Sequence, residues 1–91
     1  MLTAAMITGI NKVINHGGRE LHIQGEDLGI ETGVFEIRVY EGGTVLWMKR
    51  FPYTDLLEQN LEKKELETQL RTKMDKLART AEKAIEQGKI S

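Results

Sequence analysis

The longest uninterrupted helix pattern in the chain covers residues 61–87. Its apolar side chains recur at steps of three and four, which places them in a stripe about 100° wide on a helix of about 3.6 residues per turn. Such a stripe is stable only when it packs against another apolar surface, because tertiary packing supplies most of a helix's stability. The stripe consists of Leu66, Leu70, Met74, Leu77, Ala81, Ala84 and Ile85.

Four strands are predicted before this helix, arranged around two pairs of adjacent glycines. Gly17-Gly18 and Gly42-Gly43 favour tight turns, because glycine adopts positive φ without steric cost. The expected strands are residues 6–14, 19–24, 34–40 and 45–51. Pro52 is expected to end the last strand, because it cannot donate a ladder hydrogen bond.

The second glycine pair also predicts a register for the last hairpin. A two-residue loop pairs Glu41 with Thr44, and successive pairs then alternate between the two faces of the sheet. The inner face is expected to hold Phe35, Ile37, Val39, Leu46 and Met48. The outer face is expected to carry the pairs Tyr40 with Val45, Arg38 with Trp47, and Glu36 with Lys49, which place opposite charges together and a guanidinium near an indole ring.

The helical segment is expected to consist of two helices. Thr54-Asp55 supplies an N-cap and a first-turn acid for a short helix. Leu57 and Leu61 lie opposite the later stripe, so a break is expected near Asn60, which would cap the second helix. Gly88 is expected to end that helix, and residues 89–91 to fray.

These elements predict a single α+β domain over residues 1–91, with a four-stranded antiparallel meander at about 6–51 and a helical segment at about 54–87. A helix of 27 residues is about 40 Å long, whereas a sheet of four strands is about 15–20 Å wide. A helix lying across that sheet would overhang it. Overhang and an exposed aromatic outer face together favour a homodimer.

Charges along the helical segment are unevenly distributed, with acids concentrated before residue 68 and bases after residue 70. Favourable interaction with the helix dipole explains this distribution. Antiparallel pairing with the same helix of a second subunit explains it too, because a two-fold axis would set acid against base.

Composition excludes several classes of function. The net charge of −1 argues against a dedicated duplex-DNA binder. The absence of cysteine excludes disulfides, thiolate nucleophiles and cysteine-ligated metals, and fits a cytoplasmic protein. No run of about 18 apolar residues could span a membrane, and residues 1–6 lack the basic region of a signal peptide.

One stretch has the residue types of a metal or acid–base site, namely His22, Glu26 and Asp27. The alternative is a solvated strand face that runs into a turn, with Asp27 accepting hydrogen bonds from loop amides. Nucleophilic catalysis has less support, because the only serine is Ser91 and no threonine lies in a recognisable motif. No cofactor-binding motif is present.

The segment from Gly18 to Gly29, with its strand end His22-Ile23-Gln24-Gly25-Glu26-Asp27, resembles a family of small uncharacterised bacterial proteins. In that family an H-x-Q-x-E-D strand end precedes a glycine turn, an aromatic-rich Phe51-Pro52-Tyr53 segment and a long helix. Gly25 replaces the threonine usual there. The resemblance covers most of the chain and implies no activity.

The order of four strands and a helix is also similar to the repeat of the PUR-type single-stranded nucleic-acid-binding proteins, in architecture only. That similarity makes Arg38, Tyr40, Trp47 and Lys49 candidates for stacking bases and binding phosphates. The first hypothesis is nevertheless a non-enzymatic interaction module and homodimer. Its contact surfaces would be the helix stripe (Leu66, Leu70, Met74, Leu77, Ala81 and Ile85) and the outer sheet face (Arg38, Tyr40, Val45, Trp47 and Lys49).

Overall fold

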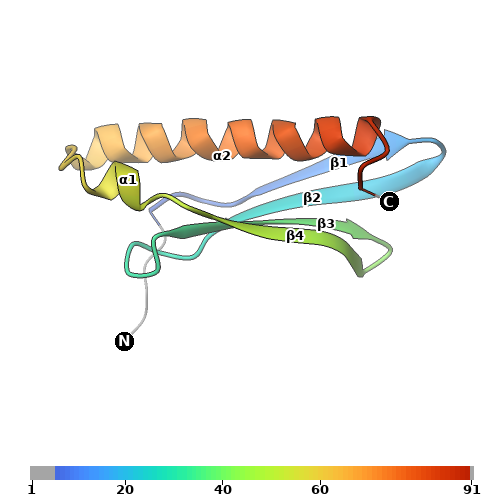
Figure 1. Cartoon of the computed structure of the whole chain (residues 1–91), viewed down its shortest axis with the longest axis horizontal. Coiled ribbons are helices and arrows are strands. Elements are labelled where there is room, and N and C mark those ends of the chain that lie inside the picture. The colour runs from blue at the N-terminus through green and yellow to red at the C-terminus, as the bar shows by residue number, and fades with distance from the viewer. Residues whose placement is uncertain (1–5, 91) are drawn as a thin grey trace.

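The computed structural model describes residues 6–90 and contains one antiparallel sheet and two helices (Figure 1). The strands follow each other in the sheet in chain order, β1-β2-β3-β4. The predicted α+β meander followed by a short and a long helix is therefore confirmed. The elements are β1 (Ile10–His16), β2 (Arg19–Asp27), β3 (Val34–Glu41), β4 (Thr44–Pro52), α1 (Thr54–Leu57) and α2 (Lys63–Glu86).

Both glycine pairs form two-residue hairpin loops. Gly17 and Gly18 have φ of 58° and 76°, and Gly42 and Gly43 have φ of 54° and 83°. Two successive positive φ angles are what a type I′ turn requires, and glycine adopts them most readily. Because each loop has only two residues, β1 continues to His16 and β4 begins at Thr44.

The first strand begins later than expected, at Ile10 rather than at residue 6. Gly9 lies directly against the backbone of β2, where a Cβ atom would be 2.6 Å from the carbonyl oxygen of Gly25. This close approach explains why a glycine stands at position 9. The second strand continues to Asp27, three residues beyond the predicted end.

The predicted register of the last hairpin is correct only next to the loop. Tyr40 pairs with Val45 as expected, but the register then shifts by one residue and Val39 pairs with Trp47. Leu46 is the extra residue of this β-bulge. Trp47 therefore lies on the inner face and packs against the core, whereas Met48 lies on the outer face. Both expectations for these two side chains were wrong.

The shift changes the other cross-strand pairs as well. Arg38 faces Met48 instead of Trp47, and Glu36 faces Arg50 instead of Lys49. Phe35 faces Phe51. Either register gives an alternating pattern, because β4 has large apolar side chains at both odd and even positions, so alternation alone could not locate the bulge.

Helix α2 runs along the strands rather than across them, and it covers one face of the sheet (Figure 1). Its buried residues Leu70, Met74, Ala78, Ala81 and Ile85 pack in the core. One cluster joins the second half of α2 to β2 and β3, and a second joins its first half to Phe35, Tyr53 and Ile7. The predicted overhang is thus wrong, because it assumed that the helix crosses the strands.

The helix ends differ from expectation in three details. Asn60 adopts a left-handed conformation, with φ of 52°, in the break between the helices, while Glu62 is the N-cap of α2. Tyr53, not Thr54, is the N-cap of α1. Gly88 ends α2 as predicted, with its N–H on the carbonyl of Ile85 at 3.0 Å. Ile90 is buried in the core rather than frayed.

Candidate functional site

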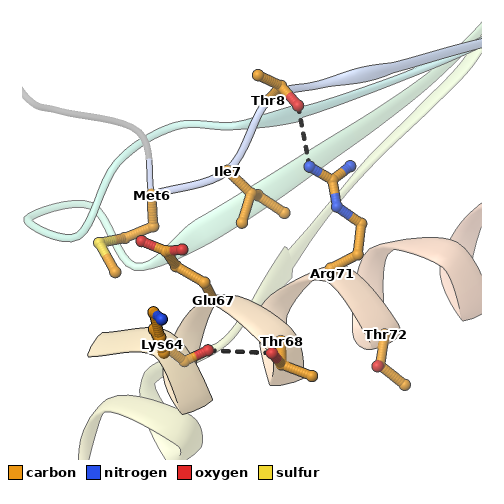
Figure 2. A pocket seen from close by; sticks show the side chains of 8 residues that line it. All are labelled: Met6, Ile7, Thr8, Lys64, Glu67, Thr68, Arg71 and Thr72. Carbon is orange, nitrogen blue, oxygen red and sulfur yellow. Dashed lines mark hydrogen bonds between the residues drawn. The ribbon is translucent and has the colours of Figure 1, made fainter. Parts of the chain in front are cut away.

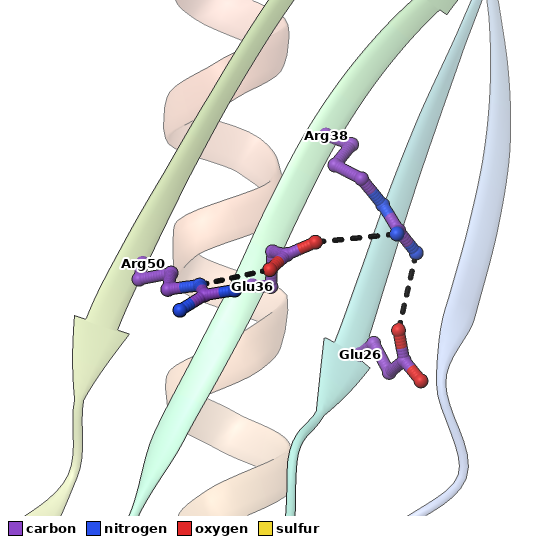
Figure 3. Close-up of polar contacts among 4 residues, drawn as sticks. All are labelled: Glu26, Glu36, Arg38 and Arg50. Carbon is purple, nitrogen blue, oxygen red and sulfur yellow. Dashed lines mark hydrogen bonds and ion pairs between the residues drawn. The ribbon is translucent and has the colours of Figure 1, made fainter. Parts of the chain in front are cut away.

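The outer face of the sheet is the broad surface that α2 leaves uncovered, and Figure 3 views it with α2 behind the strands. The register places most of its central side chains in three rows that cross the strands. The first row is Val13, His22, Tyr40 and Val45, the second is Asn11, Gln24, Arg38 and Met48, and the third is Glu26, Glu36 and Arg50.

Four charged side chains of this face form a chain of ion pairs (Figure 3). Arg38 contacts Glu26 and Glu36, each with an N–O distance of 3.2 Å, and the Nε of Arg50 lies 2.9 Å from Glu36. Glu26 and Glu36 face each other across the strands, so Arg38 relieves the repulsion between two like charges. Both guanidinium groups are therefore already neutralised by carboxylates.

Arg38 is held in place by its surroundings. Its guanidinium carbon lies 5.8 Å from the centre of the Tyr40 ring. Its Nε is buried and has no hydrogen-bond partner among the described residues. The Arg38 guanidinium is thus already engaged within the chain by two carboxylates and one aromatic ring.

Apolar side chains are exposed next to this network. Val13 is 51% exposed, and Val45 and Met48 are each 49% exposed. Tyr40 lies between the two valines in the first row. A shallow hollow of about 580 Å³ opens beside it, lined by Glu20, His22, Gln24, Tyr40, Gly42 and Gly43. This arrangement can support contact with another polypeptide, since it combines exposed apolar side chains with paired charges.

The five residues predicted to form the sheet-face surface do not lie together. Arg38, Tyr40 and Val45 are on the outer face, whereas the bulge moves Trp47 and Lys49 to the other face. The Nζ of Lys49 lies 5.4 Å from the centre of the Phe51 ring there. The structure adds Val13, Asn11 and Met48, which sequence reasoning missed. The bulge concealed Met48, whereas Val13 and Asn11 lie on β1, for which the sequence predicted no register.

The six residues predicted for self-association through the helix lie in the chain's own core. Four of them are buried, and Leu66 and Leu77 are partly buried against the same clusters. The stripe packs on the sheet, on Tyr53 and on Ile7 of the same chain. The helix stripe is therefore not an exposed surface in the monomer.

The three candidate metal ligands do not converge. His22 lies 3.1 Å from Glu20, and Glu26 contacts Arg38. Asp27 follows Glu26 in the strand, so its side chain points to the opposite face, where it is buried. Within residues 6–90, no group of three or more potential ligands is placed to hold a metal ion.

Asp27 instead anchors the start of the described chain. Its carboxylate accepts hydrogen bonds from the N–H groups of Met6 at 2.8 Å, Ile7 at 3.4 Å and Gly29 at 2.9 Å, and from the hydroxyl of Tyr53 at 2.6 Å. The alternative reading of Asp27 as an acceptor for loop amides is thus confirmed. Burial, and then the hydrogen bond to Asp27, raises the pKa of Tyr53 above its usual value.

Arg19 and Glu41 form a two-bond ion pair beside the hairpin ends, with distances of 2.8 and 2.6 Å. The hydrogen bond from Arg19 lowers the pKa of the Glu41 carboxyl, and Glu41 raises the pKa of Arg19. The pair links β2 to β3 where their ladder ends, so we assign it a structural role.

A second hollow of about 530 Å³ lies between the chain start and α2 (Figure 2). Arg71 donates to the Thr8 hydroxyl at 2.9 Å, and Thr68 donates to the Lys64 carbonyl at 3.0 Å. In the part of the chain that the structure describes, neither hydroxyl is paired with a carboxylate or a histidine. Neither hydroxyl therefore has the base partner that would activate it as a nucleophile.

No described helix is both long enough and apolar enough to cross a membrane. The resemblance to the H-x-Q-x-E-D family stays a prediction. No family model matches the chain, and no curated protein and no solved structure matches it either.

Proposed function

We propose that this chain is a non-enzymatic interaction module that self-associates through the free surfaces of its sheet. The observation that carries the proposal is the one-sided cover of the sheet. Helix α2 buries the inner face, and the outer face keeps Val13, Val45 and Met48 half exposed. Apolar side chains exposed along one face, with Tyr40 between Val13 and Val45, support a contact surface there.

The charges of the outer face also support a buried contact. Taking an unpaired charge out of water is costly, whereas a charge that already has a partner costs less. Arg38, Arg50, Glu26 and Glu36 neutralise one another within the chain. A partner could therefore cover this face without having to supply a countercharge for each of them.

Single-stranded nucleic-acid binding has less support than self-association. Its four candidate residues lie on two faces of the sheet, and Arg38 already contacts two carboxylates. Oligonucleotide binding that weakens steeply as salt rises would revive it. The cytoplasmic location expected from the sequence stays a prediction.

The test is the mass of the protein in solution over a range of concentrations, measured by light scattering at low and high salt. We expect a dimer that persists at high salt, because apolar contacts are little screened. A monomer at every concentration would contradict the proposal.

Three variants then show whether the sheet provides the contact. Val13→Glu and Val45→Glu each place a charge on the outer face, one at each edge strand. Gln69→Glu places the same charge on the exposed side of α2 and serves as the control. We expect weaker self-association in at least one of the valine variants and no change in the control.

A further inference from the structure

The two edge strands of the sheet differ in how well their free backbone groups are protected. β4 carries a bulge at Leu46, two adjacent bases, Lys49 and Arg50, and Pro52 at its end. All of these features hinder pairing with a further strand. β1 has a single lysine, Lys12, whose Nζ is turned inward to Glu82 at 2.8 Å. An inward-turned lysine gives some protection, so among the described residues β1 is the less protected of the two edges.

The hairpin register shows which backbone groups of β1 are free. The pair that closes a two-residue loop is hydrogen-bonded, and here it is His16 with Arg19. Hydrogen-bonded and non-hydrogen-bonded pairs alternate along an antiparallel ladder. The N–H and C=O groups of Asn11, Val13 and Asn15 therefore point away from β2, toward the open side of the sheet.

We propose that β1 pairs antiparallel with β1 of a second copy of this chain, in a register centred on Val13. This inference rests on the proposed self-association and names its interface. A two-fold axis at Val13 sets Val13 against Val13, and Asn11 against Asn15 in both directions. All three residues have outward backbone groups, so the pairing forms about six interchain backbone hydrogen bonds.

The side chains across this axis are compatible with one another. The half-exposed Val13 side chains meet on the outer face, and the amides of Asn11 and Asn15 can exchange hydrogen bonds there. On the inner face Lys12 lies opposite Ile14, and Ile10 lies opposite His16. No two like charges face each other in this register.

The surroundings of β1 leave room for a second strand. A groove of about 390 Å³ lies between β1 and α2, lined by Ile10, Asn11, Lys12, Asp75, Ala78 and Arg79. In Figure 3 no strand lies beside β1 on the edge that faces away from β2.

Two single-cysteine variants test the interface, because the chain has no cysteine of its own. Val13→Cys and Val45→Cys are matched, since both valines are about half exposed on the outer face of edge strands. Facing residues of a hydrogen-bonded pair have Cα atoms about 5.5 Å apart, within the range that a disulfide spans. After mild oxidation of the dimer, we expect a covalent dimer from Val13→Cys and little from Val45→Cys.

Paired substitutions at Asn11 and Asn15 test the register itself. Asn11→Asp with Asn15→Asp sets carboxylates against each other twice, and we expect dimerisation to weaken about tenfold or more. Asn11→Lys with Asn15→Asp sets lysine against aspartate twice, and dimerisation should stay within about threefold of the parent. Circular dichroism on each variant confirms that the monomer fold is retained.

The outcomes separate this inference from the proposed function. Any one of three results would overturn β1 pairing and leave self-association in place. The dimer could crosslink through Val45→Cys but not through Val13→Cys, it could crosslink equally through both, or it could tolerate the two aspartates. A monomer at every concentration overturns both. Crosslinking confined to Val13→Cys, together with loss and recovery in the two paired variants, supports the interface.

Discussion

The hydrogen bond from Tyr53 to Asp27 is expected to be among the strongest single polar contributions to the stability of this fold. The Tyr53 side chain is fully buried, and its hydroxyl donates to a carboxylate at 2.6 Å. A hydrogen bond to a charged group contributes about 1.5–3 kcal/mol. Tyr53→Phe removes this bond but keeps the ring, whose centre lies 4.6 Å from that of Phe35. We therefore expect a loss of about 2 kcal/mol in the free energy of unfolding.

Urea unfolding followed by the fluorescence of the single tryptophan, Trp47, measures this loss. In a domain of this size, about 2 kcal/mol corresponds to a decrease in Tm of roughly 8–15 °C. The other tyrosine, Tyr40, supplies the control, because its hydroxyl makes no hydrogen bond among those found in the described residues. Tyr40→Phe should change stability by less than about 0.5 kcal/mol. A Tyr53→Phe variant as stable as the parent would refute the stabilising role of the Tyr53–Asp27 hydrogen bond.

The hydrogen bond between Tyr53 and Asp27 also makes the stability of the fold depend on pH. Burial and the Asp27 hydrogen bond raise the pKa of Tyr53 in the folded state above the unfolded value of 10.0. The neutral phenol is thus favoured by folding, so its contribution is complete below about pH 10 and is lost as the pH rises further. Stability should fall above about pH 10 in the parent, and Tyr53→Phe should reduce that fall. Equal alkaline slopes in the two proteins would contradict this origin.

Three further predictions concern other parts of the fold. Glu36→Gln deprives two arginines of a shared and largely buried carboxylate and should lower the unfolding free energy by about 1–2 kcal/mol in urea. Gly88→Ala places a Cβ at φ of 72° and should cost about 1 kcal/mol by thermal unfolding, whereas Gln87→Ala next to it should cost little. The carboxyl pKa of Glu41, followed by NMR, should lie below its usual value and return toward it in Arg19→Gln.

Much of the fold is predictable from the sequence because its signals are local. Each two-glycine loop determines where a hairpin turns, and the three-to-four spacing of apolar residues determines which side of α2 is buried. The break near Asn60 is predictable for the same reason, since Leu57 and Leu61 lie on another side of the helix than the later stripe. The role of Asn60 is not predictable from the sequence, because an asparagine can either cap a helix or adopt a left-handed conformation.

The candidate surface is less predictable because it depends on pairs of distant residues. His22 and Glu26 show the expected alternation, but the sequence does not reveal that Arg38 bridges Glu26 and Glu36. Tyr53 follows a proline in a segment that reads as a connection, and nothing in its neighbourhood indicates a partner 26 residues earlier. Such contacts follow from the register of the whole sheet and from the way the chain returns from β4 past the end of β2 before α1 begins.

The bulge at Leu46 changes both the pairing of the last hairpin and the set of side chains on the outer face. One extra residue moves Trp47 to the inner face, where it packs on the core, and carries Lys49 with it. The same residue removes the aromatic and basic pair that single-stranded nucleic-acid binding would have used, and exposes Met48 in its place. It also distorts β4 as a pairing edge, while β1 keeps regular outward backbone groups around Val13. A single local irregularity thus argues against nucleic-acid binding and for the proposed self-association, and for the proposed use of β1 rather than β4 as its edge.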